Sequence, residues 1–155
     1  MIAPVTCEFV RAAIACGYAG IFFATPQAFD EATYRRYAEA HDHRVLHAVR
    51  YAGAWFNVRH MHGDDVLYDV LKSHAVDALN WHIGETPPAM SNYRASGGLQ
   101  RARITNANLD AIFHDVDHTF AQTQKRGIII APACVIRYVV DERALLKIIN
   151  KIKCL

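Results

Sequence analysis

Apolar residues along this chain recur at two spacings, and each spacing predicts one kind of element. Near the amino end, Phe9, Val10, Ala13 and Ile14 repeat with a helical period, which predicts a helix over residues 6–16. The same period, preceded by polar capping residues, predicts five further helices. They are 29–52 beginning near Asp30, a helix from Asp64 or Asp65 to Ser73, a short helix from Pro87 to Arg94, a helix opened by Asn106 with Leu109, Ile112, Phe113, Val116 and Phe120 on one stripe, and a last helix capped by Asp141 with Leu145, Ile149 and Ile152 facing inward.

Short, uniformly apolar runs separate these helices. They predict strands at residues 19–24, 54–60, 76–81, 97–100 and 128–131. Because the runs lack the alternation of a half-exposed strand, they are typical of a parallel sheet covered on both faces. Strands that alternate with helices place the chain in the α/β class.

Five strands in 155 residues fit two architectures. A doubly wound sheet loses its main support because neither GxGxxG nor GxxxxGK[ST] follows any predicted strand. The alternative, a (β/α)8 barrel, closes with about 250 residues and collects its chemistry at the carboxyl ends of its strands. We therefore expect a single domain over residues 1–155, with parallel strands alternating with helices as a partial (β/α)8 TIM-type barrel.

Side chains that can bind a metal follow three of the predicted strands. One strand ends on His60 and His62, another on His82, and a third is followed by Cys134. Side chains two apart on a strand point to the same face, so His60 and His62 are presented together. These endings predict a site at the carboxyl edge of the sheet.

Three interpretations of that site remain open. Zinc binds imidazole and thiolate, and a catalytic zinc keeps one position open, so His60, His62 and Cys134 are candidate ligands. Without a metal, His60, His62 and His82 would bind substrate carboxylates. In the third interpretation the histidines only satisfy hydrogen bonds in a polar barrel mouth, and Cys134 is a small buried apolar residue.

Four residues near these strand ends are further candidates. His82 has the chemistry of a general acid or base near neutral pH. Trp81 belongs to a pocket wall or to the core, and Asn80 binds substrate or ties down the following loop. Arg101 either meets an anionic carboxylate of a substrate or lies exposed at the surface.

Other charged and imidazole side chains have a structural interpretation. Arg59 lies between the two strand histidines, so it points to the opposite face of the strand. Two pairs, His43 with His47 and His114 with His118, are four residues apart on predicted helices but avoid the apolar stripes. We expect both pairs to lie on solvated helix faces.

Composition excludes several classes of protein. Hydrophobic residues make up 52% and charged residues 21% of the chain, as in ordinary soluble domains. The net charge of +2 is spread along the sequence, so no nucleic acid partner is expected, and no run approaches 18 apolar residues, so no membrane span is expected. The four cysteines show no CxxC spacing and no secretory leader precedes them, which predicts reduced thiols in the cytoplasm.

Five motifs together resemble, in order, the carboxyl-terminal half of the uroporphyrinogen decarboxylase family. They are residues 17–24, 55–63, 78–82, 97–99 and 130–136. The resemblance covers nearly the whole chain but only about half of the family's (β/α)8 barrel. It implies a carboxy-lyase that acts on a tetrapyrrole or another polycarboxylate and requires no cofactor, although the family's key arginine and aspartate lie in the half without a counterpart here.

The resemblance also implies an alternative chemistry. Corrinoid-dependent methyltransferases of the same superfamily hold zinc with a His-x-Cys pair on one strand and a cysteine on the last. The matching positions are His60, His62 and Cys134, with a histidine in place of the first cysteine. The two hypotheses are thus a decarboxylase-like protein and a zinc-dependent corrinoid or thiol methyltransferase, and a third is a non-catalytic half-barrel that binds a ligand.

Half a barrel leaves two parallel sheet edges open. Native proteins pair or cover such edges. We therefore expect a homodimer with twofold symmetry or, alternatively, a separate chain that supplies the amino-terminal half.

Overall fold

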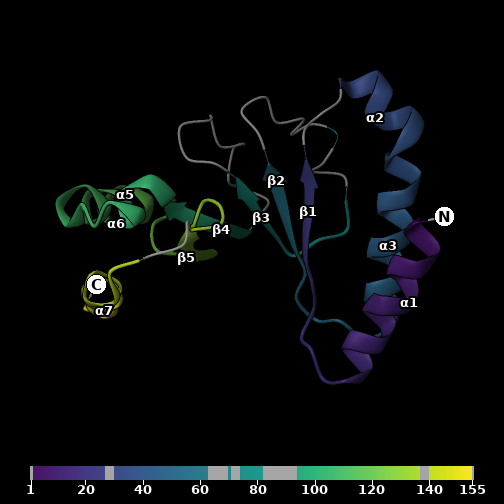
Figure 1. The fold of residues 1–155 in the computed structure, drawn as a ribbon, viewed down its shortest axis with the longest axis horizontal. Helices are drawn as coiled ribbons and strands as arrows, with labels where there is room; N and C mark the ends of the chain where they lie inside the picture. The colour runs from purple at the N-terminus through teal and green to yellow at the C-terminus, as the bar shows by residue number, and fades with distance from the viewer. Residues whose placement is uncertain are drawn as a thin grey trace. The chain divides into compact units, whose positions relative to one another are not determined.

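The structure of this protein, a computed structural model, describes residues 2–26, 30–62, 70, 74–81, 94–136 and 140–154, without the side chains of Thr25, Pro26, His62 and Trp81. Its strands are β1 (Phe22–Pro26), β2 (Val58–His62), β3 (Ala78–Trp81), β4 (Arg94–Leu99) and β5 (Ile128–Pro132). Its helices are α1 (Ile2–Ala15), α2 (Glu31–Tyr37), α3 (Glu39–Tyr51), α5 (Arg101–Thr105), α6 (Leu109–Thr123) and α7 (Glu142–Lys153). The alternation confirms the α/β class (Figure 1).

The order of the strands distinguishes the two architectures that the sequence allows. The hydrogen-bonded order is β1-β2-β3-β4-β5, so each strand lies beside its predecessor in the chain. The pairs β1 with β2 and β4 with β5 are parallel. A doubly wound sheet reverses its order at a switch point, whereas a barrel adds strands in sequence. The fold is therefore that of a partial (β/α)8 barrel.

The chain forms two compact units, Met1–Leu79 and Asn80–Leu155, with their boundary inside β3. In the first unit, α1 and α3 pack against each other on one side of β1 and β2 (Figure 1). The buried core of this unit consists of Cys7, Val10, Val45, Ala48, Val49 and Ala54. These buried residues lie in α1, in α3 and in the turn before β2. Helices that cover one face of the sheet are expected for a (β/α)8 barrel.

The second unit has its own core between β4, α6 and α7. Its buried members are Leu99, Ile104, Ile112, Val116 and Ile148. The predicted stripe of α6 is confirmed, and so is the Asp141 cap, whose carboxylate accepts from the backbone N–H of Arg143. Ile149 was expected to face inward but is 44% exposed, because Ala144 and Ile148 form the buried face of α7.

Several predicted boundaries are wrong. The helix expected over residues 29–52 is two helices, which meet at Ala38, although Asp30 caps the first as predicted. Arg94 opens β4 instead of ending a helix, and α5 was not predicted. The strand expected from residue 54 begins at Val58, because the backbone N–H groups of Trp55 and Phe56 both donate to Ala19 O in a turn.

The predicted helix ending at Ser73 lies outside the described residues except for Val70, and so does the one expected from Pro87, except for Arg94. Among the described helices, none has the length and apolar character needed to cross a membrane.

Hydrogen bonds of Asn57 and Asp77 join the residues just before β2 to those just before β3. The carboxylate of Asp77 accepts from the backbone N–H of Asn57 at 2.7 Å and from Arg50 Nη2 at 2.8 Å. The side chain of Asn57 in turn accepts from the backbone N–H of Ile21 at 3.1 Å, so it ties the approach to β1 to the approach to β2. We call this group of Asn57 and Asp77 the Asn57–Asp77 clasp.

Substituting Gly98 tests the close approach of β4 to α6. Gly98 has φ +99°, and a Cβ there would lie 2.7 Å from Thr119 Oγ1 and 2.9 Å from Thr119 Cγ2. Backbone strain and overpacking each cost about 1–3 kcal/mol. We therefore expect Gly98→Ala to lower the free energy of unfolding in urea titrations by about 2–4 kcal/mol. The neighbouring Gly97→Ala is the control, since a Cβ there makes an ordinary 3.7 Å contact, and equal losses in both variants would contradict this packing.

Candidate functional site

Strand β2 presents His60 and Arg59 to opposite sides of the sheet, as predicted. The imidazole of His60 is 5% exposed and stacks on the ring of Phe22 from β1, with ring centroids 5.4 Å apart. Phe22 is itself 59% exposed. This side of the first unit therefore combines a buried, stacked imidazole with an exposed aromatic ring.

The other side of β2 carries a buried charge network. Arg59 has no exposed surface, and its Nη2 donates to Asp42 Oδ2 at 2.8 Å and to Tyr34 Oη at 3.3 Å. Arg59 Nη1 contacts His74 Nδ1, and the guanidinium lies 5.2 Å from the ring centroid of Phe23. Tyr34 Oη donates to the same Asp42 oxygen at 2.7 Å. We call Arg59, Asp42, Tyr34 and His74 the Arg59 network.

Burial shifts two titrations in this network. Burial, together with the hydrogen bond to Asp42, raises the pKa of Tyr34 well above its usual value of 10.0, so its hydroxyl stays protonated. Burial, together with the nearby Arg59 and His43, lowers the pKa of His74 from 6.5 to about 4. His74 is therefore a neutral imidazole at pH 7.

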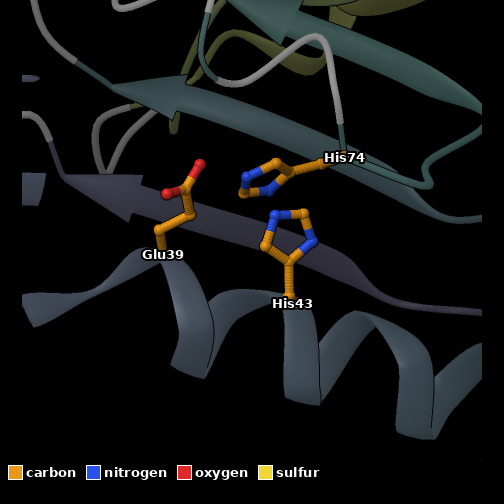
Figure 2. Close-up of side chains that lie close together, drawn as sticks. All are labelled: Glu39, His43 and His74. Carbon is orange, nitrogen blue, oxygen red and sulfur yellow. The ribbon is translucent and has the colours of Figure 1, made fainter. Parts of the chain in front are cut away.

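His74 also belongs to a cluster that could hold a metal ion. Glu39 and His43 lie four residues apart in α3, and His74 comes from the segment before β3 (Figure 2). Each offers one ligand atom, and these atoms lie within 4.8 Å of one another. The rings of His43 and His74 have centroids 4.2 Å apart. We call these three residues the Glu39–His43–His74 cluster.

The sequence pattern alone did not predict this cluster. His43 is exposed, as predicted for the pair with His47, but its ring also lies beside that of His74, and Glu39 is the third member of the group. His47 stacks on Tyr51 and is exposed, in line with the prediction for it. Glu-x-x-x-His on a helix was the available signal, whereas nothing in the sequence marks His74 as buried.

The second unit holds three of the predicted site residues. Asn80 is buried, and its Nδ2 donates to Ser96 O and to Pro132 O, so it links strands. Arg101 is half-buried at the start of α5, and Cys134 is half-buried just after β5. The structure does not test the functional roles predicted for them. His82 and the side chains of His62 and Trp81 lie outside the described residues.

The other predicted histidine pair, His114 and His118, is exposed, with the two rings stacked on each other. The neighbouring Asp115 lies instead on the buried side of α6. Asp115 is buried, because its carboxylate accepts from Arg103 Nη1 at 2.6 Å and from the backbone N–H of Gln100.

Comparison with known proteins supports the fold. No family model and no curated protein matches the sequence. Among solved structures, a methyltransferase from Methanosarcina mazei is similar, with a TM-score of 0.81 at 13% sequence identity. The similarity covers 97% of this chain and 46% of that one, so the chain spans about half of the methyltransferase's length. At this identity the likeness establishes the fold alone.

Removing the counter-charge of Arg59 tests the network. Asp42→Asn removes the Asp42 carboxylate from a fully buried guanidinium, and breaking a buried pair in this way costs about 3–5 kcal/mol. We expect that loss in the free energy of unfolding measured in urea. Asp117→Asn is the control, because its ion pair with Lys151 is exposed and contributes below about 1 kcal/mol. Similar losses in both variants would show that Arg59 does not need Asp42.

The lowered pKa of His74 predicts a pH-dependent stability in the metal-free protein. The unfolded chain binds a proton at His74 near pH 6.5, whereas the folded chain binds it only near pH 4. The contribution of His74 to the free energy of unfolding is therefore fully present above pH 6.5 and falls as the pH drops toward 4. The loss is on the order of 3 kcal/mol. Unfolding titrations in a chelator should show this fall, and His74→Gln should remove it. An NMR titration that protonates the native His74 ring near pH 6.5 would contradict the prediction.

Proposed function

We propose that this chain is part of a metal-dependent methyltransferase that moves a methyl group from a corrinoid to a thiol, with zinc bound at β2. The observation that carries the proposal is the fold shared with the methyltransferase from Methanosarcina mazei over 97% of the chain. The similarity favours this interpretation over the carboxy-lyase. Because this chain spans about half of that protein, the remaining strands of a closed barrel would come from further chain or from a partner.

The described residues of β2 fit this chemistry. Imidazole is a ligand that zinc prefers, and His60 offers one whose ring is fixed by burial and by stacking on Phe22. His62 and Cys134 complete the ligand set that the sequence predicts. When bound, zinc would lower the pKa of a thiol and so present it as a thiolate. The exposed ring of Phe22 offers an apolar surface beside that position.

The proposed reaction balances without an added oxidant or reductant. The thiol loses its proton to solvent before the transfer. A lone pair of the thiolate sulfur then forms the new carbon–sulfur bond as the bond between the methyl carbon and the corrinoid cobalt breaks. The electron pair of the broken carbon–cobalt bond stays with the cobalt. The role of this chain is to hold the thiol close to the methyl carbon and to keep water away.

The test combines zinc binding with methyl transfer in the full chain. The zinc-loaded protein is incubated with methylcobalamin and a small thiol, and the methyl thioether is measured by mass spectrometry. We expect thioether formation above the protein-free rate. His60→Ala should lower this rate at least about tenfold and should bind one zinc per chain fewer than the natural chain. His118→Ala is the matched control, because His118 is exposed on α6. Thioether at the protein-free rate, or unchanged activity and zinc in His60→Ala, would overturn the proposal.

A further inference from the structure

The Glu39–His43–His74 cluster lies on the helix side of β2, whereas His60 stacks on Phe22 on the other. It therefore cannot be the zinc position proposed for methyl transfer. Two imidazoles and one carboxylate form a donor set that suits a divalent transition metal and leaves a fourth position open. The question is whether the surroundings allow His74 to act as a ligand.

The hydrogen bonds around His74 identify the nitrogen whose lone pair can bind a metal. An arginine can only donate, so Arg59 Nη1 requires the lone pair of His74 Nδ1. In a neutral imidazole the proton is then on Nε2, which lies 3.5 Å from Tyr34 Oη. The Tyr34 hydroxyl in turn donates a hydrogen bond to Asp42. A metal-binding histidine commonly has its other ring nitrogen oriented by such a chain of acceptors ending in a carboxylate.

Arg59 therefore places a positive group where a metal ion would bind His74. Its Nη2 is bonded to Asp42 and Tyr34, so the guanidinium keeps these partners if Nη1 moves away. Glu39 also has an atom available for a metal, because Arg35 binds only Oε1 of its carboxylate at 3.1 Å. The second carboxylate oxygen of Glu39 can serve as a ligand while that ion pair persists.

We propose that Glu39, His43 and His74 bind one divalent transition metal of the zinc type, with His74 Nδ1 as a ligand in place of its bond to Arg59 Nη1. In the metal-free state Arg59 Nη1 contacts His74 Nδ1, and a bound metal replaces that contact. Tyr34 and Asp42 orient the His74 ring and act as positioning residues.

The test measures zinc binding to the full chain after chelator treatment, by isothermal titration calorimetry. Two ligands are suited to substitution, because His43 is exposed and Glu39 lies in the first turn of α3. We expect His43→Ala and Glu39→Gln each to weaken binding at this site at least about tenfold. His47→Ala is the matched control, one turn further along the same exposed face, and should bind zinc as the natural chain does.

A second measurement separates a ligand role from a structural one. Tyr34→Phe keeps the ring but removes the hydroxyl that accepts from His74 Nε2. We therefore expect zinc to bind at least about tenfold more weakly, at unchanged stoichiometry. Zinc affinity unchanged in both His43→Ala and Glu39→Gln would overturn the proposal. His60→Ala keeps this zinc, whereas the zinc proposed for methyl transfer is lost in that variant, so each proposal can fail alone.

Discussion

The first compact unit depends on keeping one fully buried charge satisfied. Arg59 has no exposed surface, and moving such an ion out of water costs several kcal/mol unless partners replace the water. Asp42 supplies the opposite charge, while Tyr34 and His74 supply oxygen and nitrogen atoms at fixed positions. These partners come from α2, α3 and the segment before β3. The guanidinium therefore sets where two helices and a loop meet β2, and this contributes geometric specificity more than net stability.

Alternation along β2 separates two kinds of chemistry within neighbouring residues. His60 shares its side with the exposed ring of Phe22, which suits contact with a ligand. Arg59 faces the helices, where His74 and His43 come together away from that ring. A shift of one residue in the pairing of β2 with β1 would exchange the two faces, so the parallel register is a condition for both candidate sites.

Periodicity predicts much of the fold but little of the helix-side site. The apolar stripe of α6 and the caps at Asp30 and Asp141 follow from local rules, and the structure confirms them. The break at Ala38 has no side-chain cap, so no local signal marks it. His74 is missed for a different reason: its burial depends on Arg59, which is fifteen residues away, and on Tyr34, which is forty away. Predictions of this kind need tertiary contacts.

The Asn57–Asp77 clasp has a consequence for how this chain can vary in length. It joins residues twenty apart at the entrances of β2 and β3, so the two ends of this segment are held together. The entropy of closing a loop rises only with the logarithm of its length. A change of length between the end of β2 and His74 would therefore alter the free energy of closure only slightly, whereas a change inside β2 would shift its register. In the first case His74, three residues before Asp77, would stay beside Arg59.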